Sequence, residues 1–184
     1  MKKYCLIIFL IVLLCCAFGC QQGEKAVEET LAELEELKAQ AKIEEQNKTI
    51  VLRWFGELSK SHFEPLYEEL FSPDSKQYIP PNAEPLSFED YKPMAKKIYD
   101  AFPEITHTVD DIIAEGDKVV ARILVHTVHE GEFAGIPATG RELEWAAIAI
   151  FELSDGKIKT RWEIADILGL SQQLGMELKP KEGE

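Results

Sequence analysis

The stretch "KIKTRWEIADILGLSQQLG", residues 157–175, combines a strand pattern with a helix pattern. Its first half alternates as a β-strand does, and its second half has the leucine spacing of a short helix. Side chains two residues apart on a strand share a face. The residues expected on one face are Ile158, Trp162, Ile164 and Asp166. The aspartate at the junction is therefore predicted either to cap the helix or to lie among apolar side chains at the end of a pocket.

Three earlier stretches also alternate with a period of two, at residues 105–115, 118–130 and 141–153. The turns "EGD" and "SDG" and the longer loop "GEFAGIPATG" separate the alternating stretches. Short turns of this kind join antiparallel neighbours. The second half of the domain is therefore predicted to be a sheet of antiparallel strands.

Upstream of these strands the apolar residues recur at three-residue and four-residue steps, which indicates helices. The helical segments are "NKTIVLRWFGELSKS" from Asn47, "HFEPLYEELFS" from His62 and "LSFEDYKPMAKKIYDAFPE" from Leu86. In the third, Ser87 and the aspartate three residues on resemble a capping box. Helices followed by strands and a closing helix predict an α+β domain, with the helices packed on one face of a curved antiparallel sheet.

The chain begins with "MKKYCLIIFLIVLLCCAFGC", in which two lysines precede an uncharged run from Tyr4 to Phe18. This run is shorter than the roughly 20 residues that a helix needs to cross a bilayer, so residues 1–19 are predicted to be a signal segment. Residues Ala17 to Cys20 resemble the lipobox of bacterial lipoproteins, in which the cysteine is acylated. The resemblance implies a lipid on Cys20 and attachment to the bacterial cell envelope outside the cytoplasm, at the outer membrane where the cell has one. A plain secretory signal and an uncleaved anchor helix are the alternatives.

All 4 cysteines lie in that first segment, so no disulfide or cysteine-ligated metal site is predicted for the domain. His126 and His129 are expected on opposite faces of one strand, so no other metal site is predicted, and no cofactor is predicted either. Residues 20–46 are acidic, with leucines at helical steps, and predict an exposed helical tether. A coiled-coil or partner helix is the alternative. The domain is expected over residues 47–176, followed by a polar tail at 177–184. The formal net charge of −13 disfavours nucleic acid as a partner.

Three motifs occur in order in the second half of the chain: "FPEITHTVDDIIAEGDKVVARI", "HEGEFAGIPATGRE" and "DGKIKTRWEIADILGLSQQLG". Together they resemble the SnoaL-like polyketide cyclases and their ester cyclase relatives, in the nuclear transport factor two-like superfamily. The resemblance covers roughly residues 47–176. It implies a cone-shaped fold, in which a strongly bent antiparallel sheet wraps helices around an internal pocket.

The best-understood members of that family close a ring by intramolecular aldol condensation, with one pocket aspartate as acid and base. The resemblance places this aspartate at Asp166, four residues after Trp162. A carboxylate beside an indole and isoleucines is poorly solvated, and desolvation raises a carboxyl pKa towards the range that proton transfer needs. The other interpretation is that Asp166 caps the following helix, and the two roles are compatible.

Other pocket candidates come from the neighbouring strands. Arg122 and His126 share a face and are expected to anchor an anionic or carbonyl group, although a structural ion pair of Arg122 is the alternative. The resemblance puts Tyr78 where many members carry a histidine and Glu152 where ring-closing members place a second pocket histidine. The remaining candidates are Trp145 and Trp162.

These observations leave three hypotheses for function. The first is an enzyme that uses Asp166 on a small carbonyl compound or ester. The second is a pocket that binds a small apolar molecule without chemistry, because one fold hosts many functions. The third is a structural envelope protein that forms a homodimer through the outer face of the sheet, where Ile148 and Ile150 lie on an apolar strand.

Overall fold

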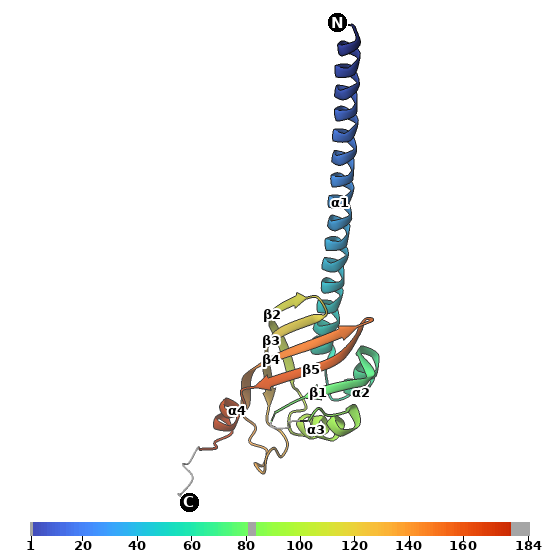
Figure 1. The fold of residues 1–184 in the computed structure, drawn as a ribbon. Helices are drawn as coiled ribbons and strands as arrows, with labels where there is room; N and C mark the ends of the chain where they lie inside the picture. Colours follow the sequence, from blue (N-terminus) through green and yellow to red (C-terminus); the bar gives the residue numbers. More distant parts are fainter. Residues whose placement is uncertain (1, 81–83, 178–184) are drawn as a thin grey trace, which may run out of the picture. The chain divides into compact units, whose positions relative to one another are not determined.

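The computed structural model describes the backbone of residues 2–80 and 84–177 and the side chains of residues 25–80 and 84–177. The chain forms two compact units, Met1–Lys42 and Ile43–Glu184. The helices are α1 (Lys2–Glu57), α2 (Phe63–Leu70), α3 (Phe88–Ala101) and α4 (Ile167–Gln173) (Figure 1). The strands are β1 (Phe71–Tyr78), β2 (Thr106–Glu115), β3 (Lys118–Val128), β4 (Glu142–Ser154) and β5 (Lys157–Ala165).

The predicted α+β fold with a curved sheet is confirmed, but the sheet is mixed rather than purely antiparallel. Its strand order is β1-β5-β4-β3-β2, and β2 to β5 pair antiparallel as predicted. The fifth strand, β1, pairs parallel with β5 and was not predicted. Its residues had been assigned in part to the second helix, which ends instead at Leu70. β1 forms one edge of the sheet and β2 forms the other.

The helices start and end largely where the sequence indicates. The hydroxyl of Ser87 accepts a hydrogen bond from the Asp90 amide at 3.2 Å, as the capping prediction required. The predicted tether is helical, and its apolar side chains at Val27, Leu31 and Leu37 are exposed. Its function as a tether or as a partner helix stays a prediction.

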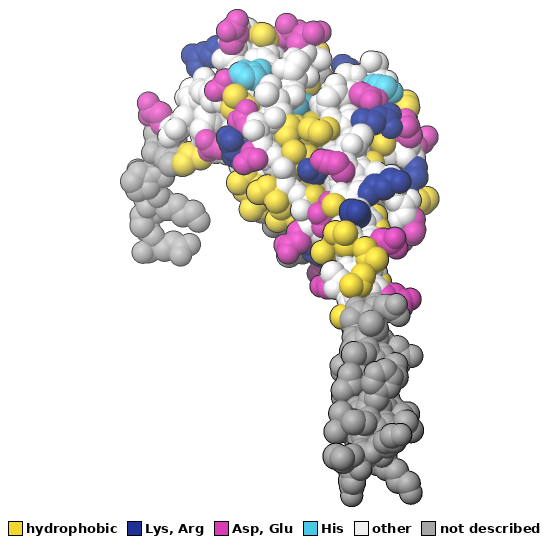
Figure 2. Space-filling model, turned by 90° about the horizontal axis from the view of Figure 1, so that it is seen from above, with side chains coloured by type: hydrophobic (Ala, Val, Ile, Leu, Met, Phe, Trp, Pro, Cys, Tyr) yellow, Lys and Arg dark blue, Asp and Glu magenta, His cyan; other side chains and the backbone are white. Residues whose placement is uncertain are grey.

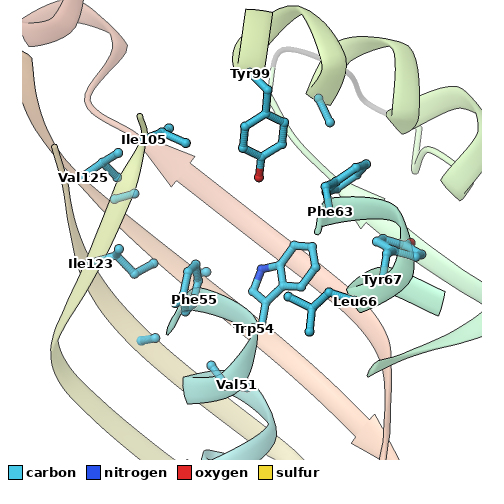
Figure 3. Packing of buried hydrophobic residues seen from close by; sticks show 14 of the residues in the cluster. Val51, Trp54, Phe55, Phe63, Leu66, Tyr67, Tyr99, Ile105, Ile123 and Val125 are labelled. Atoms are coloured by element: carbon cyan, nitrogen blue, oxygen red, sulfur yellow. The ribbon is translucent and has the colours of Figure 1, made fainter. Parts of the chain in front are cut away.

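The core lies between the helices and the inner face of the sheet. Trp54 of α1 is fully buried and packs edge-on against Phe71 with 4.8 Å between ring centroids. Figure 3 shows Trp54 close to Leu66 and Tyr67 of α2, with Ile123 and Val125 of β3 on the opposite side. Edge-on aromatic pairs of this kind stabilise a core beyond the area that they bury.

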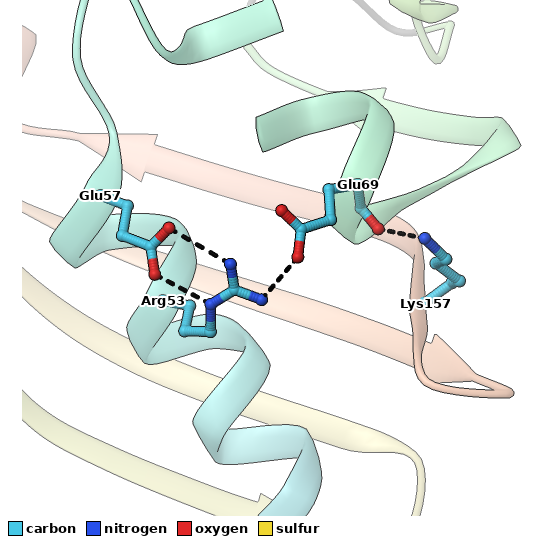
Figure 4. A network of polar contacts seen from close by, with 4 residues as sticks. All are labelled: Arg53, Glu57, Glu69 and Lys157. Atoms are coloured by element: carbon cyan, nitrogen blue, oxygen red, sulfur yellow. Dashed lines mark hydrogen bonds and ion pairs between the residues drawn. The ribbon is translucent and has the colours of Figure 1, made fainter. Parts of the chain in front are cut away.

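Polar contacts fasten the end of α1 to α2 (Figure 4). The guanidinium of Arg53 donates to the carboxylates of Glu57, at 2.9 and 3.2 Å, and of Glu69, at 2.8 Å. The ammonium of Lys157 donates to the Glu69 carbonyl oxygen, which links α2 to the start of β5. These side chains are partly exposed, so water screens each ion pair, and the pairs mainly orient the helices.

A register irregularity in β5 decides which side chains face the interior. Leu153 pairs with Ile158 and Glu152 pairs with Thr160, so Lys159 is the extra residue of a bulge. An extra residue shifts the alternation by one position. Before the bulge, the even-numbered Ile158 is fully buried. After the bulge, the odd-numbered side chains point inward, so Arg161 is 2% exposed, whereas the even-numbered Ile164 is 69% exposed. The expectation that Ile158, Trp162, Ile164 and Asp166 share one face is therefore wrong.

The surface of the described residues is strongly acidic, with apolar patches between the charges (Figure 2). Part of this apolar surface belongs to the outer face of the sheet, where Val120, Ile148, Ile150 and Ile164 are exposed. The strand pairing brings Ile150 beside Val120 and Ile148 beside Ile164. Both faces of the sheet therefore carry apolar rows, as the sequence of β4 indicated.

Candidate functional site

A cavity of about 940 Å³ lies between α1, α3 and the inner face of the sheet. A volume of this size suits a small organic molecule. Most of its wall is apolar and is contributed by Phe55, Met94, Phe102, Ile123, Phe133 and Trp145. The loop between β3 and β4 also reaches the cavity through Phe133, so it shapes part of the wall.

The polar side chains of the cavity wall include a buried cation, Arg161 of β5. Its guanidinium lies over the ring of Tyr91 at 5.0 Å and 3.5 Å from a carboxylate oxygen of Glu163. Burial opposes the charge, but Tyr91 and Glu163 outweigh burial and hold the pKa of Arg161 above its ordinary value. The Nε atom of Arg161 is buried without a hydrogen-bond partner among the described residues.

His107 of β2 and Glu163 of β5 bring an imidazole and a carboxylate to the same wall. Burial lowers the pKa of His107 to about 4, although the nearby Glu163 carboxylate acts in the opposite direction. The imidazole is therefore neutral at pH 7. Its Nδ1 atom is buried, and no described residue donates to it or accepts from it. The cavity thus holds a cation, a carboxylate and a neutral imidazole within an apolar wall.

Asp166 lies outside this cavity wall. Its side chain is exposed and accepts a hydrogen bond from the Gly169 amide at 2.8 Å, so it is the N-cap of α4. The capping prediction is confirmed, and the expectation of a poorly solvated Asp166 is wrong because the bulge in β5 turns the apolar even-numbered residues outward. A catalytic role of Asp166 stays a prediction.

Of the other candidates, Trp145 lines the cavity. Trp162 does not, and stacks instead on Tyr78 with 5.0 Å between ring centroids. Arg122 is exposed and pairs with Asp110 at 2.9 Å, which is the structural alternative named above. His126 lies 3.1 Å from a carboxylate oxygen of Glu144 at the surface.

Glu152 of β4 also points away from the cavity. It alternates with the buried Phe151 and Leu153, and its carboxylate accepts a hydrogen bond from the Thr160 hydroxyl at 3.2 Å. The expected pocket position for Glu152 is therefore wrong. Tyr78, Arg122, His126 and Trp162 are likewise absent from the cavity wall.

The fold and the cavity agree with a comparison against known families. Residues 49–174, more than half of the chain, match the family model of the SnoaL-like polyketide cyclases. The chain belongs to this family.

Two relatives of known name are cyclases. The chain is 34% identical over 84 residues to the aklanonic acid methyl ester cyclase DnrD of Streptomyces peucetius, covering 45% of this chain and 58% of the relative. It is equally similar over 84 residues to the enzyme of the same name, DauD, of Streptomyces sp. strain C5, covering 45% of this chain and 52% of the relative. The chain thus spans little more than half the length of the relatives that it matches.

Solved structures of SnoaL-like proteins share the fold. AclR of Streptomyces galilaeus, a proposed hydroxylase, is 27% identical with a TM-score of 0.66, over 72% of this chain and 97% of that one. IdmH of Streptomyces antibioticus, a proposed polyketide cyclase, is 29% identical with a TM-score of 0.65, over 71% of this chain and 99% of that one. Proteins of one fold are therefore assigned different reactions, so the reaction has to be argued from the cavity.

His107, Arg161 and Glu163 line the cavity but were not predicted from the sequence. Arg161 and Glu163 flank Trp162 within the motif that carried the resemblance, but an unbroken alternation assigned them to the outer face. Their charge also favoured the outer face, because buried Arg and Glu are rare unless paired, so the sequence held no signal that placed them inside. Within the part of the chain that the structure describes, no group of three or more His, Cys, Asp or Glu side chains is arranged to hold a metal ion.

Proposed function

We propose that the cavity binds a small, mainly apolar carbonyl compound and that Glu163 acts as the acid and base of a ring closure. The observation that supports this proposal is the position of Glu163 in the wall of an apolar cavity beside the buried Arg161. The other acidic side chains of the wall are engaged by groups that do not line the cavity. Asp100 pairs with Lys60 and Lys96, and Glu132 accepts a hydrogen bond from the Gly135 amide.

The proposed reaction is an intramolecular aldol addition, the ring-closing step of an aldol condensation. The Glu163 carboxylate takes a proton from a carbon next to a carbonyl group, and the electron pair of that C–H bond forms an enolate. The enolate carbon attacks a second carbonyl carbon of the same molecule, which forms a C–C bond and an alkoxide. The alkoxide then takes the proton back from the Glu163 carboxyl group, so the product is an isomer of the substrate. A fixed cation such as Arg161 lowers the energy of the charge that develops.

The test compares Glu163→Gln with Asp166→Asn in the full chain. The first substrate to assay is aklanonic acid methyl ester, which the relatives DnrD and DauD are named for. Loss of a general acid and base lowers kcat by roughly 10²- to 10⁴-fold, and we expect this loss for Glu163→Gln only. A ring closure that Glu163→Gln leaves unchanged and Asp166→Asn abolishes would contradict the assignment and support Asp166 as the catalytic group.

The same cavity is compatible with binding alone. If the wild-type protein retains a carbonyl compound from the expression host, native mass spectrometry detects that ligand and shows whether it changes on incubation. A retained ligand that is recovered chemically unchanged would favour a binding protein over an enzyme.

We also propose that the chain is attached to the cell envelope through acylated Cys20. The support is the sequence pattern before Cys20, because residues 1–24 lie outside the side chains that the structure describes. From residue 25 to residue 177, apart from residues 81–83, no helix is long and apolar enough to span a membrane. Intact-mass analysis of protein extracted from membranes tests the proposal, since an unmodified Cys20 contradicts it.

Pairing of two copies through the outer face of the sheet is the last part of the proposed function. Its support is the exposed apolar row that contains Val120, Ile148, Ile150 and Ile164. The charge of Arg122 beside this row is paired within the face, with Asp110 at 2.9 Å. Sedimentation of wild type and Ile148→Lys tests the pairing: a wild type that stays monomeric at micromolar concentration contradicts it.

A further inference from the structure

Tyr99 of α3 contributes a hydroxyl group to the cavity that the proposed reaction has not used. The side chain is 6% exposed and lines the cavity. Its ring packs on Phe63 with 5.7 Å between centroids. Figure 3 shows the hydroxyl pointing from α3 into the space between Phe63, Trp54 and Ile105. The ring therefore has a packing role, whereas the hydroxyl is directed at the interior.

The Tyr99 hydroxyl differs from that of a neighbouring buried tyrosine. The hydroxyl of Tyr67 lies 2.8 Å from the Ser75 hydroxyl and accepts from the Gln77 amide at 2.9 Å. No hydrogen bond to the Tyr99 hydroxyl is found among the residues that the structure describes. A hydroxyl that lines the cavity and is not engaged by another side chain is a candidate for binding a ligand.

The Tyr99 hydroxyl stays protonated, and the ring of Tyr99 is linked by packing to the groups that the proposed reaction uses. Burial raises the pKa of Tyr99, Tyr91 and Glu163 raise it further, and Arg161 opposes them. The hydroxyl is therefore a protonated donor throughout the neutral range. Tyr91 packs on Phe63, as Tyr99 does, and the Arg161 guanidinium lies 5.0 Å from the Tyr91 ring. The donor, the guanidinium and its partner Glu163 therefore line the same part of the cavity.

We propose that the Tyr99 hydroxyl donates a hydrogen bond to a carbonyl oxygen of the ligand and thereby orients the adjacent C–H bond towards Glu163. Tyr99 is then a specificity-determining residue, which selects ketones and esters over hydrocarbons of the same shape. The hydrogen bond strengthens when the carbonyl oxygen gains charge as an enolate. The orientation towards Glu163 rests on the proposed function, whereas the hydrogen bond itself does not require turnover.

The test uses two probes of matched shape, 2-acetylnaphthalene and 2-ethylnaphthalene, with the full chain as wild type and as Tyr99→Phe. We expect wild type to bind the ketone about 3- to 10-fold more tightly than the hydrocarbon, and Tyr99→Phe to lose this preference. Comparing two proteins with the same probes cancels any partition of the probes into detergent or lipid. The matched control is Tyr67→Phe, which also removes a buried hydroxyl but leaves the cavity wall intact and should keep the preference.

An infrared measurement separates hydrogen bonding from packing. With a ¹³C-labelled carbonyl in 2-acetylnaphthalene, the C=O stretching band should lie at lower frequency in wild type and in Tyr67→Phe than in Tyr99→Phe. A wild type that shows no preference for the ketone, including one that binds neither probe, would overturn the proposal. A Tyr99→Phe variant that still prefers the ketone and shows the same C=O stretching frequency as wild type would also overturn the proposal.

The same experiment distinguishes failure of this inference from failure of the proposed function. A band shift that depends on Tyr99, with no ring closure of any substrate, supports the hydrogen bond and contradicts the enzyme. Ring closure that depends on Glu163 but not on Tyr99, with an unshifted band, supports the enzyme and overturns the role of Tyr99.

Discussion

Lowering the pH from 7 to 4 should weaken the folded domain in part through one imidazole, that of His107. Burial lowers the pKa of this imidazole from 6.5 to about 4, so the folded protein keeps it neutral while the unfolded chain takes up a proton below pH 6.5. The stability contributed by neutral His107 is therefore complete above pH 6.5 and is lost as the pH falls towards 4. The pKa of His107 differs between the unfolded and the folded state, and at about 1.4 kcal/mol per pH unit this difference corresponds to roughly 3 kcal/mol of unfolding free energy.

The assay is urea unfolding at several pH values between 7 and 4, for wild type and for His107→Gln, whose side chain stays neutral throughout. Carboxyl groups titrate in both proteins, so their effect cancels in the difference between the two unfolding free energies. The unfolding free energy of wild type, relative to that of His107→Gln, should fall by about 3 kcal/mol between pH 7 and pH 4. Parallel pH curves for the two proteins would mean that the imidazole is solvated in the folded state and would refute the reasoning.

Two further predictions concern local geometry. Asp166→Ala should lower the free energy of unfolding by about 1 kcal/mol because the Gly169 amide loses its acceptor, and an unchanged urea midpoint would contradict that role. Gly131→Ala should cost about 1 to 3 kcal/mol, because the added Cβ would lie 2.2 Å from the Asp100 carbonyl oxygen. Gly56→Ala is the control, since a Cβ there meets nothing within 4 Å, and equal midpoints for these two alanine variants would contradict the clash.

The strands with strict alternation were predictable from sequence. In β3, Val119, Ala121 and Ile123 are buried as the period of two requires. β1 was not predictable, because "FSPDSKQY" includes Pro73 and other residues with low strand propensity. It is a strand because β5 provides a backbone partner at the sheet edge, where proline is tolerated. The backbone pairing with β5 therefore makes β1 a strand, although its residues have a low strand propensity.

The cavity was harder to predict because its polar residues contradict the pattern around them. The sequence of β5 favours Trp162 and Ile164 inside and Arg161 and Glu163 outside, which is the lower-energy choice for an ordinary core. The bulge at Lys159 reverses that choice. Segments that violate local rules are expected at functional sites, where chemistry rather than packing sets the residue type. The same reversal supplies the outer face of the sheet with apolar side chains.

The parallel pairing of β1 with β5 also has a consequence for the order of folding. Gln77 and Arg161 are paired neighbours, although almost half of the chain separates them in sequence. Strands β2 and β3, by contrast, meet through a short turn, so their pairing sacrifices much less chain entropy. The hairpins are therefore expected to form early, and β1 to dock onto β5 late. Because Gln77 of β1 pairs with Arg161, which lines the cavity, this late step completes the sheet directly beside the cavity wall.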